Sequence, residues 1–307
     1  WLIGRPLRTA DSEQQTIGKF IGLAVFSSDA MSSVAYAPQE MLIVLAAAGT
    51  AGLGYSIPLA IAIVILLTIL TLSYEQTIHT YTNGGGAYIV SRDNLGEYPA
   101  MIAAAALLTD YILTVAVSIS SGVAQIVSAA PAFEAYRVPI AVAMVVFIMV
   151  VNLRGIKESG SAFAIPSYFF VLMMFLTVGV GFFRFLVTGT LGQVAHPPQD
   201  LMHEVVQPVT IFLILKAFSS GTTALTGVEA ISNGITAFKE PRSKNAGITL
   251  IMMACILGSL MLGITFLSHQ VGALPSEEET VISQLARTVF GDRGFIYLAT
   301  IVSTTVI

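Results

Sequence analysis

Long apolar segments separated by short polar loops recur along the whole of this 307-residue chain. A helix needs about 20 apolar residues to cross the hydrocarbon core of a bilayer. Hydrophobic residues make up 55% of the sequence and charged residues only 10%, whereas soluble domains are about 25% charged. The sequence therefore predicts an all-α polytopic membrane protein. We expect seven spans and the start of an eighth, near residues 18–48, 57–74, 98–129, 138–153, 163–187, 208–236, 246–269 and from 291 onward.

The Lys and Arg residues of the loops predict how these spans are oriented. Cytoplasmic loops of membrane proteins carry an excess of both residues. With the N-terminus in the cytoplasm, the inner side holds Arg5, Arg8, Lys19, Arg92, Arg154, Lys157, Lys239, Arg242 and Lys244, and the outer side holds Arg137, Arg184, Arg287 and Arg293. We therefore expect residues 1–17 to form a cytoplasmic segment of a multi-pass plasma-membrane protein. The net charge of −4 argues against nucleic acid as a partner.

Two polar interruptions occur in otherwise apolar spans, and both begin with Phe-Ser-Ser. One is Phe26–Ser33 in the first span, and the other is Phe218–Thr223 in the sixth. The second interruption lies five spans after the first, and because this number is odd the second copy would be inverted in the membrane. Discontinuous helices in inverted repeats form the binding sites of many secondary transporters. The alternative is that these hydroxyl groups bond to the main chain of unbroken helices or allow close packing.

The paired interruptions divide the chain into two units. We expect residues 18–187 to form a first five-helix repeat and residues 208–307 to begin an inverted second repeat. The chain starts at Trp1 and stops within an apolar run. We therefore expect it to be the N-terminal portion of a longer transmembrane transporter domain.

Three acidic residues fall within predicted spans, where an ionised group costs at least about 2.5–3.5 kcal/mol. They are Asp29 in the first interruption, Asp110 in the third span and Glu229 just after the second interruption. A single nearby base, Lys216, cannot neutralise all three. Carboxylates, hydroxyl groups and freed carbonyl groups together offer hard oxygen ligands. The pattern predicts a monovalent-cation site at Asp29, Asp110 and Glu229.

Hydroxyl-bearing residues accompany these acids. Thr114 and Ser118 follow Asp110 at intervals of four, so their oxygens lie in one row on a helix face. Thr226 stands three residues before Glu229, and Tyr36 stands seven residues after Asp29. Among crowded carboxylates at least one is expected to hold a proton at neutral pH.

We assign the proton-coupling role to Glu229. Glu40, one turn beyond Tyr36, is expected to cap the outer half of the first span or lie near the surface. We do not expect it to contact the cargo directly.

The remaining motifs indicate neither an enzyme nor a resident cofactor. The glycine-rich segment Asn83–Tyr88 is followed by no Gly-Lys-Ser/Thr, so it is not a phosphate loop. We expect a flexible or closely packed turn there, and transport driven by ion gradients. The four histidines are scattered, which suggests no transition-metal site.

The motifs together resemble those of the KUP potassium-uptake family, within the amino acid–polyamine–organocation (APC) superfamily, and especially its bacterial KimA-like branch. Ser28–Tyr36 is similar to the first-helix motif, with an Asp, a Ser four residues later and a Tyr seven residues later. Asp110, Thr114 and Ser118 match the third-helix pattern, and Thr226–Ala230 matches the sixth-helix motif.

The resemblance implies a LeuT/APC-type five-plus-five inverted repeat and proton-coupled potassium import. It also implies a C-terminal cytoplasmic domain that helps form a homodimer. The family's potassium path would be lined here by Asp29, Tyr36, Asp110, Thr114, Ser118, Thr226 and Glu229.

Two other functions fit parts of the sequence. An amino-acid/proton symporter of the same superfamily would share the region from Thr226 to Asn245. However, Asp29 would repel the carboxylate of an amino acid at close range. An intramembrane aspartyl protease could use Asp29 and Asp110 as its two acids, but the repeated interruption has no role in that chemistry.

Overall fold

The computed structural model describes residues 16–153, 156–194, 207–276, 279–291 and 294–307, and the secondary structure of this part is helical. Six of its helices are long and apolar enough to cross a membrane, and two further apolar helices are shorter. The prediction of an all-α polytopic membrane protein is confirmed. The elements are α1 (Lys19–Ala46), α2 (Gly49–Leu53), α3 (Ser56–Thr80), α4 (Gly86–Leu95), α5 (Glu97–Ala129), η2 (Pro131–Tyr136), α6 (Arg137–Asn152), α7 (Ile156–Thr188), α8 (Ile211–Gly221), η4 (Thr222–Leu225), α9 (Ala230–Asn233), η5 (Ile235–Ala237), α10 (Arg242–Val271), α11 (Val281–Phe290) and α12 (Phe295–Val306).

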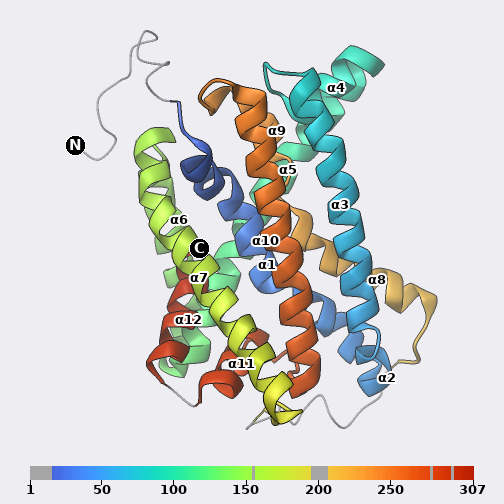
Figure 1. The fold of residues 1–307 in the computed structure, drawn as a ribbon, viewed down its shortest axis with the longest axis vertical. Coiled ribbons are helices and arrows are strands. Elements are labelled where there is room, and N and C mark those ends of the chain that lie inside the picture. Colours follow the sequence, from blue (N-terminus) through green and yellow to red (C-terminus); the bar gives the residue numbers. More distant parts are fainter. Residues whose placement is uncertain (1–15, 154–155, 195–206, 277–278, 292–293) are drawn as a thin grey trace.

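Helix α1 lies in the middle of the bundle, where it packs against α7, α8 and α10 (Figure 1). Its side chains Met31, Met41 and Leu45 are fully buried in the main apolar core. The start of α1 lies at the same end of the bundle as α4 and α9, whereas α2 and α11 lie at the opposite end (Figure 1). Helix α6 instead presents apolar side chains outward, including Val138 and Phe147, as contact with lipid requires.

The expected break in the first span is wrong, because α1 is a continuous helix from Lys19 to Ala46. The Ser28, Ser32 and Ser33 hydroxyl groups donate hydrogen bonds to carbonyl oxygens three or four residues earlier, at 2.8–3.1 Å. Hydroxyl groups that bond back in this way satisfy themselves within a helix and leave its main chain paired. A run of small polar residues therefore interrupts the apolar sequence here but not the helix.

The expected break in the sixth span is confirmed. Helix α8 ends at Gly221, a 3₁₀ turn follows, and α9 begins only at Ala230. Between them Thr226 is extended, with ψ of 143°, and Gly227 has φ of +80°. Only glycine adopts this left-handed conformation without steric cost, so Gly227 allows the chain to turn between the two half-helices.

Three short helices, α2, α4 and α11, were not expected. Helix α11 falls where the sequence suggested an outer loop, and its first turn is capped by Thr280, whose hydroxyl accepts from the Ser283 N–H at 3.2 Å. Helix α4 follows the glycine-rich turn on the side expected to be cytoplasmic. Neither helix reaches the 20 residues of a membrane span, so a search for apolar segments of that length does not detect them.

Replacing Gln284 with Leu should destabilise the end of the bundle that holds α2 and α11. The buried Gln284 amide donates to the Leu274 carbonyl at 2.6 Å and accepts from the Leu274 N–H at 3.2 Å. Its loss leaves buried main-chain groups unpaired, at a cost of about 1–3 kcal/mol. Thermal unfolding of the purified protein in detergent should show a lower midpoint. Gln76→Leu, at an exposed position of α3, is the matched control, and equal midpoints for the two variants would contradict the prediction.

Candidate functional site

A cluster of five hydroxyl groups joins α1, α5 and the broken sixth helix. Ser33 Oγ lies 2.5 Å from Thr226 Oγ1 and 3.1 Å from the Tyr36 hydroxyl, and Ser32 Oγ lies 3.0 Å from Ser118 Oγ. Tyr36 lies on the same side of α1 as Ser32 and Ser33, because it follows them by four and three residues. We call these five residues the hydroxyl cluster. It connects the continuous central helix to the segment that has left helical geometry.

The Asp29 side chain lies against the turn of the broken helix. A Cβ atom placed on Gly227 would stand 2.7 Å from Asp29 Oδ2 and 2.9 Å from the Ala30 nitrogen. Glycine at this position therefore supplies both the left-handed backbone and the room for the carboxylate. The acid occupies the place where freed main-chain groups meet α1.

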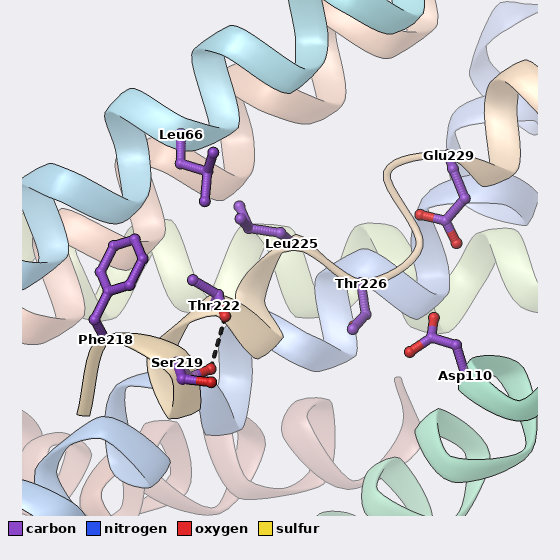
Figure 2. Close-up of a pocket in the computed structure, with 8 residues that line it drawn as sticks. All are labelled: Leu66, Asp110, Phe218, Ser219, Thr222, Leu225, Thr226 and Glu229. Carbon is purple, nitrogen blue, oxygen red and sulfur yellow. Dashed lines mark hydrogen bonds between the residues drawn. The ribbon is translucent and has the colours of Figure 1, made fainter. Parts of the chain in front are cut away.

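Asp110 and Glu229 face a pocket with a volume of about 490 Å³. Figure 2 shows their carboxylates pointing toward one another, beyond Thr226 on the unwound segment. The Glu229 side chain is buried, and its Oε1 has no hydrogen-bond partner among the described residues. The other residues that line the pocket are Leu66, Phe218, Ser219, Thr222 and Leu225.

The charges of the three acids are not balanced by nearby bases. In the described part of the chain, no ion pair within 4.0 Å joins Asp29, Asp110 or Glu229 to a basic side chain. Lys216 is exposed on α8. Excess negative charge at membrane depth calls for a cationic ligand or bound protons.

The structure brings most of the predicted site residues to the broken helix. Tyr36 and Ser118 join Thr226 in the hydroxyl cluster, and Thr114 is buried on α5, one turn from Asp110. Within the ranges described, however, no three His, Cys, Asp or Glu side chains converge on a single metal position. Cation binding at Asp29, Asp110 and Glu229 stays a prediction, and hydroxyl or carbonyl oxygens would have to complete the ligand set.

Ser32 and Ser33 belong to the site, although the sequence reading did not select them. Their signal was their position three and four residues after Asp29, which places them on the same face of a continuous helix. This spacing places the two serines beside Asp29 only if the first span is a continuous helix. The mistaken break in α1 therefore hid two residues of the hydroxyl cluster.

The glycine-rich turn packs closely against the broken helix. Of the two expected forms, flexible or closely packed, the structure shows the closely packed one. The Gly85 N–H donates to the Asn233 carbonyl at 3.4 Å, and a Cβ on Gly86 would clash with Asn233 Oδ1. The Asn233 amide in turn donates to the Tyr111 hydroxyl at 2.8 Å. These contacts fix the second half-helix to α5 and to the turn before α4.

A comparison with known families now identifies the scaffold. The profile of the amino acid permease family matches residues 19–307, which include every helix from α1 to α12. The chain belongs to the amino acid permease family. Membership of a permease family removes the protease alternative, because the family's proteins carry solutes across membranes.

Individual relatives of this permease include three bacterial proteins. The potassium transporter KimA of Bacillus subtilis is 51% identical over 298 residues, which cover 97% of this chain and 49% of KimA. A probable potassium transport protein, Kup of Corynebacterium glutamicum, is 26% identical over 62% of this chain and 31% of its own length. The low-affinity Kup protein of Pectobacterium atrosepticum is 27% identical over 52% of this chain and 25% of its own length.

These matches confirm the resemblance to the KimA-like branch of the KUP family. The chain spans about half the length of the B. subtilis relative and less of the other two. The helices described above therefore correspond to only part of each of those proteins.

Gly227→Ala should displace the Asp29 carboxylate and impair the site. The added methyl group would meet Asp29 Oδ2 at 2.7 Å, and alanine also strains a backbone with φ of +80°. Gly272→Ala separates the two effects, since Gly272 has φ of +68° and open space around it. We expect both variants to unfold at lower temperature but only Gly227→Ala to lose cation binding, measured with radioactive rubidium. Equal binding by the two variants would show that the contact with Asp29 has no functional role.

Proposed function

We propose that the full-length protein imports potassium in symport with protons across the plasma membrane. The observation that carries this proposal is the Asp29 carboxylate held against the turn of the broken helix at Gly227. The names of the three relatives, each a potassium transporter or transport protein, support the same cargo.

The position of Asp29 favours a cation over an amino acid. Amino-acid carriers of this architecture offer freed N–H groups and the positive end of a half-helix to the carboxylate of their substrate. Here a protein carboxylate already lies at the turn. The carboxyl carbon of Asp29 is 2.9 Å from the position that a Cβ on Gly227 would take. Two like charges at such range repel strongly when little water separates them. An anionic substrate group would be excluded, and a cation would be attracted.

The groups around Asp29 match what a potassium ion needs. A dehydrated monovalent cation requires several oxygen ligands in place of its hydration shell. The hydroxyl cluster and the carboxylate of Asp29 supply such oxygens. The ligands are hard and carry a modest charge, which suits a monovalent ion better than a transition metal.

Glu229 is the proposed carrier of the proton. It is buried beside the unwound segment, lacks a basic partner in the described part of the chain, and faces Asp110 across the pocket. Two facing carboxylates in a poorly solvated site favour a state in which one holds a proton. Proton release and cation entry can then be linked by charge balance.

We further propose that the N-terminus is cytoplasmic and that the protein forms a homodimer. The orientation rests on the excess of Lys and Arg on one side of the spans. The side with the start of α1, α4 and α9 in Figure 1 would then face the cytoplasm. The homodimer rests on the family resemblance alone.

Asp29→Asn and Asp110→Asn should abolish potassium uptake while leaving the protein folded, because each removes a charge from the site and keeps the size of the side chain. Uptake of rubidium into proteoliposomes made with the full-length protein measures the loss. Asp93→Asn, at an exposed position of α4, should transport normally. Wild-type uptake by either site variant would remove that acid from the cation path.

The same proteoliposomes decide between the two transport functions. Under a proton gradient we expect rubidium uptake and no uptake of a mixture of radioactive amino acids. Amino-acid uptake without rubidium uptake would establish the amino-acid/proton symporter instead.

Glu229→Gln should make uptake insensitive to the proton gradient, because glutamine cannot bind the coupled proton. Wild-type uptake should increase when the outside is made more acidic than the inside. The variant should show the same rate with and without this gradient. Glu97→Gln, at an exposed helix end, is the control that should respond like the wild type. A normal response from Glu229→Gln would show that the proton travels elsewhere.

A further inference from the structure

A second pocket, with a volume of about 400 Å³, lies between α1 and α5. Five of its eight lining residues have polar side chains, and the sequence reading gave none of these five except Tyr36 a place in the site. The lining residues are Tyr36, Gln39, Glu40, Ala116, Val117, Ser120, Ser121 and Ala124.

This pocket lies beyond the hydroxyl cluster, on the side of α2 and α11. Along α1, Glu40 follows Asp29 by eleven residues, which corresponds to about 16 Å at 1.5 Å per residue. Along α5, Ser120 and Ser121 lie just beyond Ser118 in the same direction. The first pocket, with Asp110 and Glu229, is bordered by Thr226 of the cluster. Tyr36 belongs to both regions, since it lines the second pocket and bonds to Ser33.

Glu40 is the charged group of this pocket. The expectation that it caps a helix end does not fit the structure, because α1 continues to Ala46. No ion pair within 4.0 Å joins Glu40 to a base in the part of the chain that the structure describes. A carboxylate within an apolar span needs water or a counter-ion, and the pocket has room for both.

The adjacent Gln39 has a different role. Its Oε1 accepts a hydrogen bond from the Val281 N–H at 2.9 Å. The side chain thus ties the first turn of α11 to the edge of the pocket. The Gln39 amide oxygen is thus engaged in structure, which leaves Glu40 and the oxygens of Ser120 and Ser121 available to a cation. The Ser120 hydroxyl donates to the Ala116 carbonyl at 2.8 Å, but its oxygen can still accept a cation.

We propose that this pocket is an outer binding site for one partly hydrated monovalent cation, centred on Glu40. This proposal replaces the expectation from the sequence that Glu40 does not contact the cargo. This inference rests on the proposed cation transport and adds a site that precedes the acids near the broken helix. At about 30 Å³ per water molecule, the pocket holds an ion together with several waters. A single carboxylate balances one positive charge, whereas calcium sites in proteins use several carboxylate ligands. The ion would be held here before it passes the hydroxyl cluster.

The test in transport is Glu40→Gln in the full-length protein, measured as rubidium uptake at increasing external rubidium. Losing the charge should raise KM about tenfold, which corresponds to ~1.4 kcal/mol of lost attraction, while the maximal rate changes less than twofold. Glu134→Gln, an exposed residue of η2, should leave KM unchanged. An unchanged KM in Glu40→Gln would overturn the proposal and identify the pocket as a solvated vestibule.

A binding measurement keeps the proposal testable apart from transport. Rubidium binding to the detergent-solubilised full-length protein is measured at equilibrium in Asp29→Asn, where the inner acid is lost. We expect this variant to retain binding that Glu40→Gln, added to it, removes. Ala124→Leu, which fills the pocket without changing charge, should also remove it. Absence of rubidium binding in Asp29→Asn would overturn the outer site.

The two measurements also separate this inference from the proposed function. If the wild type transported amino acids instead of rubidium, the proposed function of potassium transport would be wrong. Retained, Glu40-dependent rubidium binding in Asp29→Asn would still support the outer site in that case.

Discussion

Main-chain polar groups at membrane depth must find partners, and the structure around the site follows from this requirement. In the break from Thr222 to Glu229, local hydrogen bonds such as Thr226 N–H to the Thr223 carbonyl and Ala230 N–H to the Gly227 carbonyl replace α-helical ones, and a continuous α1 packs beside it. Ser33 bonds to the extended Thr226 across the interface. Further along, Phe26 and Phe238 stack with ring centroids 5.3 Å apart, and a Cβ at Gly22 would clash with Phe238. One intact helix thus supports one broken helix through small residues, aromatic rings and hydroxyl groups.

The continuous helix α1 also determines which charged group lies at the turn of the broken helix. Because α1 remains helical, Asp29 cannot move away from the turn as it could on an unwound strand. Its carboxylate stays against Gly227, while Asp110 and Glu229 face the pocket on the far side of Thr226. A scaffold shared with amino acid permeases can in this way favour a cation, since a single acid at the turn reverses the preference for a substrate carboxylate.

Much of the fold follows from apolar run length, which is why the long spans and a break in the sixth span were predicted. The break begins at Thr222, however, whereas Phe218–Gly221 of the predicted interruption are still helical. The continuity of α1 was not, since a Ser-rich run reads the same whether its hydroxyl groups line a break or bond to their own helix. Helix α11 was missed because ten residues fall below the length of a span. For the site, acids in apolar runs revealed Asp29, Asp110 and Glu229. Ser32 and Ser33 depend on a helical register that composition alone does not fix.

The hydroxyl cluster borders both pockets, because Thr226 lines the first, Tyr36 lines the second, and Ser33 bonds to both of these residues. Hydrogen bonds between neutral groups contribute only about 0.5–1.5 kcal/mol each to stability. A cation can therefore separate them at small cost, because each hydroxyl oxygen that loses its neighbour gains an ion as its new partner. Under the proposed cation transport, the hydroxyl groups that bond to one another in the absence of cargo would then bind the cargo as it passes. This exchange requires no large movement of α1, which agrees with its continuous helical main chain.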